Sequence, residues 1–236
     1  MWVTAKASAS NGWAIILPLY PCAKNTVFSI IQAAGWPIWP LIACSVLALA
    51  LVLERFVALQ TTRVAPPRLL EEVLQVTARG LPNPEVTAKL AQNSALGEVL
   101  ASGLQLLQQQ PRCNEADLRA TLEGQGRAVA QRLEKSLTAL ATIASAAPLL
   151  GLLGTVIGMI EIFGASPAAS GGNPVQLAHG ISVALYNTAF GLIVAIPTLI
   201  FWRYFRSRVD AHVLAMELAT DRFARHLLRL RAPGAA

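Results

Sequence analysis

The sequence predicts an all-α membrane protein that crosses a bilayer three times and extends long helices into the cytoplasm. Hydrophobic residues make up 54% of the 236 residues and charged residues only 14%, against about 25% charged in soluble domains. Three stretches carry almost no charge over the roughly 20 residues that a bilayer-spanning helix needs. The basic residues gather in only two of the segments between and after these stretches. This composition also argues against disorder, which needs low hydrophobicity and high charge.

The three apolar stretches set the element boundaries. They cover residues 27–53, 137–160 and 177–202, and the only titratable side chains of the third are His179 and Tyr186. We therefore expect an N-terminal extension (1–26), a first transmembrane helix (27–59), a cytoplasmic helical domain (60–135), a second transmembrane helix (136–164), an outer loop (165–176), a third transmembrane helix (177–205) and a cytoplasmic helical tail (206–236).

The N-terminal extension holds an apolar run at 13–23 that Pro18 and Pro21 interrupt. The run is too short to span a bilayer and lacks a clear small-residue cleavage site. Two interpretations stay open. The extension is either a disordered or interfacial arm, or an artefact of the assigned start.

The distribution of the basic residues predicts which side of the membrane each segment faces. Of 19 Lys and Arg residues, ten lie between Arg55 and Lys135 and seven between Arg203 and Arg231, whereas residues 165–178 have none. The positive-inside rule then places these two basic segments in the cytoplasm, with the N-terminus and the outer loop on the opposite side. The net charge of +6 is thus a topology signal. Because topology accounts for this charge, we expect no nucleic-acid partner.

The cytoplasmic segments have helical patterns. Helices are predicted over 68–79, 85–110 and 114–137, with Asn114 as N-cap of the last. Because no breaker proline lies between Asn114 and the second span, we expect one continuous helix to run into it. The tail carries an apolar stripe at helical spacing, which favours packing against the other cytoplasmic helices: Val209, Val213, Met216, Phe223, Leu227 and Leu230. A helix over 177–230 would be roughly 80 Å long.

The second span is rich in glycine. Gly154 and Gly158 form a small-xxx-small pair that lets two helices approach closely in lipid. With Gly151, they predict a tight helix–helix seam. Pro148 is expected to kink the helix. Thr155 adds a hydroxyl that would face an internal cavity, although a threonine can also bond its own backbone.

The third span carries Asn187 and Thr188 near its middle. An unsatisfied amide in hydrocarbon is costly, so Asn187 should face protein or water. Thr155 and Thr188 could form one polar layer between the second and third helices. Gly191 and Pro197 are expected to be helix-packing positions.

One carboxylate, Glu161, lies inside an apolar run. Intramembrane acids often mark ion pathways, so Glu161 joins Thr155, Thr188 and Asn187 as a candidate residue of a proton path. Its position near the uncharged loop favours the alternative that it reaches water at that interface, and His179 has the same alternative.

The sequence lacks the patterns of several enzyme classes. It has no phosphate-binding loop, no HExxH motif and no nucleophile elbow. Cys22, Cys44 and Cys113 have no metal-ligand spacing. We therefore expect no enzyme, no cofactor and no metal site. A proton conductor with so few intramembrane acids would need a partner to supply the titrating group.

These motifs carry a family resemblance. The segment APLLGLLGTVIGMIEIF (147–163), an uncharged loop and GISVALYNTAFGLIVAIPTLIF (180–201) resemble the MotA/TolQ/ExbB proton-channel family, most closely its ExbB branch. The segment 35–59, with its trailing Glu54 and Arg55, is similar to the first span of that branch. The resemblance covers about residues 27–230.

The resemblance implies a homopentamer in the bacterial inner membrane, with the N-terminus periplasmic. Its lumen would hold ExbD-like single-span partners, each with a membrane aspartate, and proton flow would energise a TonB-like protein for outer-membrane import. By the same resemblance, Thr155 and Thr188 face the partner aspartate. Where ExbB sequences have a glutamate this chain has Val183, so that lumen acid does not carry over.

Three alternatives stay open. A TolQ-like subunit would serve envelope maintenance, and sequence separates it poorly from the ExbB branch. A MotA-type flagellar stator fits less well, because MotA has four spans. A passive, non-conducting scaffold would use the glycine seam for assembly alone.

Overall fold

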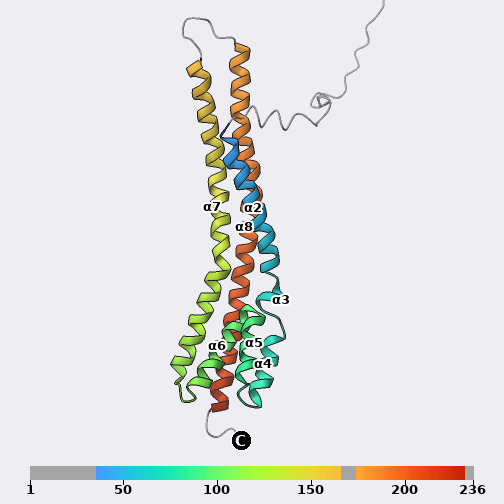
Figure 1. Cartoon of the computed structure of the whole chain (residues 1–236), viewed down its shortest axis with the longest axis vertical. Coiled ribbons are helices and arrows are strands. Elements are labelled where there is room, and N and C mark those ends of the chain that lie inside the picture. The colour runs from blue at the N-terminus through green and yellow to red at the C-terminus, as the bar shows by residue number, and fades with distance from the viewer. Residues whose placement is uncertain (1–35, 166–173, 232–236) are drawn as a thin grey trace, which may run out of the picture.

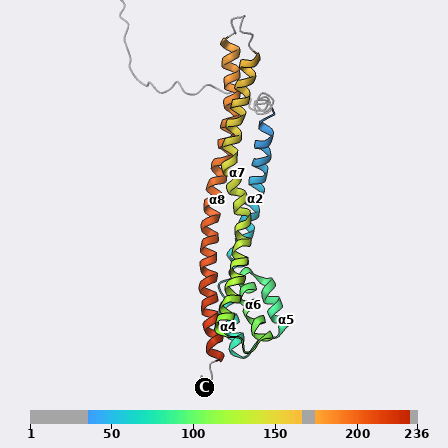
Figure 2. The ribbon, with the colours of Figure 1, turned by 90° about the vertical axis from the view of Figure 1, so that its left-hand side faces the viewer.

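Three long helices and four short ones form the described part of the chain. The structure is a computed structural model that describes residues 36–165 and 174–231. In these ranges every regular element is an α-helix. The long helices α2 (Ile38–Ala58), α7 (Glu115–Ala165) and α8 (Pro174–Arg231) run side by side. The short ones gather beside one end of α7 and α8 (Figure 1, Figure 2), and we refer to them together as the base: α3 (Thr61–Val64), α4 (Leu69–Ala78), α5 (Pro84–Asn93) and α6 (Ala95–Gln109).

The long helices supply three candidate membrane spans. The most apolar windows of α2, α7 and α8 have mean hydropathies of 2.2, 2.0 and 1.8. Each helix is long and apolar enough to cross a bilayer. The prediction of an all-α chain with three candidate spans is therefore confirmed. The N-terminal extension and residues 27–35 of the expected first span lie outside the described residues, as does most of the outer loop.

Two of these helices continue far beyond the apolar stretches. α7 has 51 residues and α8 has 58, so they extend about 77 and 87 Å at 1.5 Å per residue. Asn114 caps α7, since its Oδ1 accepts a hydrogen bond from the backbone N–H of Asp117 at 2.7 Å. Pro148 and Pro197 both lie inside their helices. The expectation that the second span continues an extramembrane helix is confirmed.

The expected single helix over 85–110 is wrong. The structure divides it into α5 and α6 at Ser94, whose backbone is extended with φ −160° and ψ 164°. The Ser94 hydroxyl accepts a hydrogen bond from the N–H of Gly97 at 3.0 Å, so Ser94 is an N-cap. A Cβ at Gly97 would lie 2.3 Å from the Leu90 carbonyl oxygen, and glycine therefore lets the two helices meet. The short helix α3 was not predicted.

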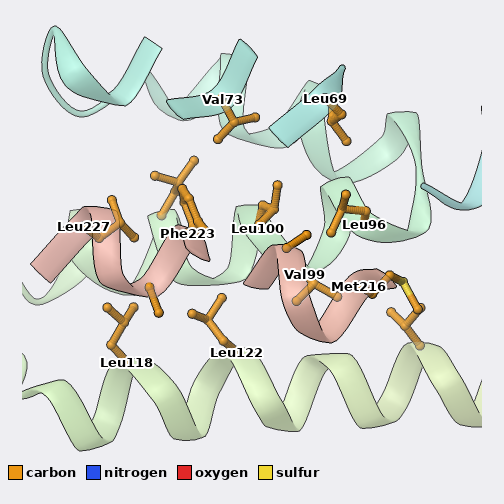
Figure 3. Close-up of a cluster of buried hydrophobic side chains, with 14 of the residues drawn as sticks. Leu69, Val73, Leu96, Val99, Leu100, Leu118, Leu122, Met216, Phe223 and Leu227 are labelled. Atoms are coloured by element: carbon orange, nitrogen blue, oxygen red, sulfur yellow. The ribbon is translucent and has the colours of Figure 1, made fainter. Parts of the chain in front are cut away.

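A buried apolar cluster joins the base to α7 and α8. Phe223, Leu100 and Leu118 have no exposed surface and pack together with residues of α4 (Figure 3). Of the stripe predicted on the tail, all members but two are buried. Val213 is half-buried and Leu230 is exposed. The interpretation of the stripe as a packing face is thus confirmed, except at Leu230.

Candidate functional site

A seam of small residues brings α7 and α8 together inside the spans. A Cβ at Gly151 would lie 2.8 Å from the Asn187 carbonyl oxygen, and a Cβ at Gly191 2.7 Å from the Ala147 carbonyl oxygen. A Cβ at Gly158 would lie 3.1 Å from that of Ala184. Contacts this close leave no room for larger side chains, so the glycines let the two backbones touch.

Asn187 lies within this seam. Its side chain is buried, with 2% exposure, and packs on Gly154. A Cβ there would be 2.8 Å from the Asn187 Cβ and 3.0 Å from its Nδ2. The amide thus faces protein, as its cost in hydrocarbon predicts.

The hydroxyls of Thr155 and Thr188 both donate hydrogen bonds to backbone carbonyls. The Thr188 hydroxyl donates to the Gly151 carbonyl oxygen on the facing helix at 3.3 Å. The Thr155 hydroxyl donates to the Leu152 carbonyl oxygen, one turn back on its own helix, at 2.6 Å. Each hydroxyl oxygen also carries lone pairs that accept hydrogen bonds. Both side chains are half-buried, and in this arrangement they offer acceptor sites.

Helix α2 covers only one flank of the α7–α8 pair. In the spans, Leu41 of α2 packs in a cluster with Leu150 of α7 and with Phe190 of α8. At about 100° per residue, Thr155 is roughly 140° around α7 from Leu150, and Thr188 roughly 160° around α8 from Phe190. Both threonines therefore lie on the flank of the pair that α2 leaves uncovered. We call this the open flank.

Glu161 lies on a different side of α7 from Thr155. It is exposed near the end of the helix, eleven residues after Leu150. Eleven residues are about three turns, so Glu161 points to the α2 side and is roughly 120° from Thr155. The structure thus separates Glu161 from the two threonines. The side chains of His179 and Val183 lie outside the described residues.

A buried arginine fastens the end of α2 to α7. Arg55 is 6% exposed and donates to the Leu133 carbonyl oxygen at 2.9 Å and to the Ser136 hydroxyl at 2.5 Å. It also pairs with Glu54 at 3.3 Å. The adjacent Phe56 packs edge-on against Phe205 of α8, with ring centroids 5.0 Å apart.

The end of α2 is also held from α8. The buried His212 contacts the Leu59 carbonyl oxygen through Nε2 at 3.2 Å. Because a carbonyl only accepts, Nε2 carries the proton, and His212 satisfies one of the last free carbonyls of α2. Sequence reasoning missed these anchors. The signal at Arg55 was a charged pair, Glu54 and Arg55, directly after an uncharged span, which was interpreted as a topology marker and as part of the family resemblance.

The comparisons with known proteins point to one family. Residues 91–218 match the model of the MotA/TolQ/ExbB proton channel family. The chain is 36% identical to "Putative biopolymer transport protein ExbB-like 3" of Synechocystis sp. over 180 residues, which cover 75% of this chain and 83% of the relative. It is 33% identical to "Biopolymer transport protein exbB1" of Vibrio cholerae, over 71% of this chain and 74% of the relative. It is 37% identical to "Tol-Pal system protein TolQ" of Pseudomonas aeruginosa, over 44% of this chain and 47% of the relative.

The helices and the comparisons together define a class of protein. Three candidate spans and long continuous helices describe a multi-pass membrane protein rather than a soluble one. The chain belongs to the MotA/TolQ/ExbB proton channel family, and it is ExbB-like. This is a family of proton-channel subunits and not an enzyme family.

Proposed function

We propose that this chain is the proton-channel subunit of an inner-membrane complex that uses the proton-motive force to energise TonB-dependent outer-membrane import. Five copies assemble around a lumen, which encloses single-span partners that each carry a membrane aspartate. The N-terminus faces the periplasm and the base faces the cytoplasm. The family supports the proton-channel role, and the distribution of basic residues supports the orientation.

The open flank is the observation that carries this proposal. It presents the hydroxyls of Thr155 and Thr188, and α2 leaves it uncovered. In the assembly this flank faces the lumen. The threonine oxygens then accept a hydrogen bond from the protonated partner aspartate or from water, while their own protons stay on the helix carbonyls. Glu161 lies off this path, and Asn187 holds the seam behind it.

Proton flux through single-residue variants tests the proposal. The chain and its partner are reconstituted in liposomes, and flux is followed with a pH-sensitive dye. Thr188→Val should keep the assembly but lower the flux, whereas Thr188→Ser should retain it because the hydroxyl remains. Thr142→Val is the matched control. Thr142 makes a similar bond to its own helix, 2.9 Å to the Thr138 carbonyl oxygen, but lies on the opposite face of α7 from Gly151. Normal flux in Thr188→Val would contradict the assigned role.

The relatives keep a second function open. Two of them are named as TolQ of the Tol-Pal system, so the same channel could serve envelope maintenance. Deletion of the gene separates the two. Loss of uptake of iron chelates indicates the TonB-linked role, and leakage of periplasmic contents indicates the TolQ-like one. A non-conducting scaffold would assemble, but neither the unchanged chain nor any variant would conduct protons. Native mass spectrometry with and without the partner would give the stoichiometry of the assembly.

A further inference from the structure

A second feature of the open flank lies far from the threonines, at the end of α7 and α8 that packs with the base. A groove of about 350 Å³ opens there between the two helices. Its lining is apolar, with Leu122, Val99 and Met216 among the buried residues (Figure 3), and charged side chains form its rim.

The groove lies in line with the span threonines. Gly126, which lines it on α7, precedes Thr155 by 29 residues, or about eight turns of 3.6 residues. Thr220, which lines it on α8, follows Thr188 by 32 residues, or about nine turns. Both helices are continuous over these lengths. Whatever occupies the open flank in the spans therefore faces the groove when its chain continues toward the base.

The rim leaves one negative charge uncompensated. Arg119 contacts Asp221 at 3.7 Å across the groove, and Arg127 pairs with Glu123 at 3.3 Å. Glu217 is exposed at the rim and has no ion pair among the described residues. The groove thus suits a segment with an apolar side chain for the floor and a basic one for Glu217.

We infer that the groove docks the cytoplasmic segment of the single-span partner, next to its membrane helix. The inference rests on the proposed function. The positive-inside rule makes the cytoplasmic flank of a membrane helix basic, which complements Glu217. The distance also fits. Gly126 precedes the apolar stretch that starts at Leu137 by eleven residues, or about 16 Å along α7, which about five extended residues cover.

Docking would fix the partner at a second point below the membrane. A partner held only by its membrane helix can turn freely about its axis. A basic segment seated between α7 and α8 resists that turning and sets the height of the partner aspartate relative to the threonines. Release and rebinding at successive subunits would then accompany each step of the partner.

A photo-reactive amino acid at Thr220 tests the inference in the full complex of chain and partner. Illumination should give an adduct that mass spectrometry maps to partner residues on the cytoplasmic side of its membrane helix. The control places the same probe at Leu218, which is exposed on α8 and does not line the groove. It should give at least about tenfold less adduct, a ratio that corresponds to about 1.4 kcal/mol.

Two variants test the groove itself. A Cβ at Gly126 meets nothing within 4 Å and Gly126 lines the groove, so Gly126→Leu should narrow the groove and abolish the adduct. Gly124 also has open space around it but does not line the groove, so Gly124→Leu should leave the adduct unchanged. Glu217→Gln should lower the yield of the adduct, because it removes the negative charge at the rim without changing the shape of the groove.

The outcomes separate this inference from the proposed function. A complex that keeps its partner but gives no adduct from position 220 overturns the docking alone. An adduct with another copy of this chain also overturns it, because the groove would then be a contact between subunits. A chain that retains no partner at all contradicts the proposed function itself.

Discussion

The α7–α8 seam makes a sharp prediction about Gly154. The change is Gly154→Ala, which adds one methyl group in the middle of the second span. That carbon would lie 2.8 Å from the Asn187 Cβ and 3.0 Å from its Cγ. Carbon atoms pack at about 3.5–4.0 Å, so the helices must separate locally by roughly 0.7 Å or more. The Asn187 Cβ is fixed to the backbone of α8 and cannot rotate away.

The magnitude follows from two opposing terms. Overpacking of a close contact costs about 1–3 kcal/mol, whereas exchanging glycine for alanine inside a helix gains up to about 1 kcal/mol. Gly124→Ala isolates the second term, because a Cβ at Gly124 meets nothing within 4 Å and Gly124 lies inside the same helix. The two variants should therefore differ by about 1–3 kcal/mol, with Gly154→Ala the less stable.

Thermal unfolding of the purified chain in detergent measures this difference. For a chain of this size 1 kcal/mol shifts Tm by about 2–4 °C, so Gly154→Ala should melt about 2–12 °C below Gly124→Ala. Asn187→Gly in the Gly154→Ala background removes the opposing carbon and should recover part of the loss. Equal melting temperatures for the two alanine variants would refute the close seam.

Three further outcomes follow from single contacts. Arg55→Met should lower Tm because it removes charged hydrogen bonds that contribute about 1.5–3 kcal/mol each, while Arg63→Met, at an exposed position, should not. Ser94→Ala should cost about 1 kcal/mol by removing the cap of α6, measured by thermal unfolding of the full chain; an unchanged Tm would contradict that role. Glu161→Gln should leave proton flux in liposomes unchanged, and a large loss would return this carboxylate to the path.

Composition and periodicity predict the long elements but not the breaks between short ones. Uncharged length is a strong signal, because a bilayer imposes it, and it located α2 and the spans of α7 and α8. The break at Ser94 was missed because no proline or glycine marks it, and its neighbours continue a helical pattern. Its cause is a cap bond to Gly97 together with a close contact at Leu90, and both depend on how α5 folds back on α6.

The sequence predicted which residue types form the candidate site, but not which side of each helix they face. The small-xxx-small pattern indicated the seam, and the structure has close contacts at those positions. No periodicity within one helix reveals which flank α2 covers, since that depends on which residues Leu41 meets. For this reason sequence reasoning grouped Glu161 with Thr155, although the packing of α2 puts them on different sides of α7.

The same geometry connects the spans to the base. α7 and α8 are held together by close backbone contacts at Gly151 and Gly191 in the spans, and by ion pairs such as Arg206 with Glu134 at 3.2 Å further along. Arg55 adds α2 to the pair at about that level. In the proposed complex, this rigid pair spans the distance from the threonines to the groove, so a partner held at both places must move against both. A probe on α7 at the groove should therefore respond to the protonation state of the partner aspartate, and Gly126→Leu should change the flux even though it lies outside the membrane. Unchanged flux in a Gly126→Leu complex that has lost its cross-link would mean that the groove only tethers the partner.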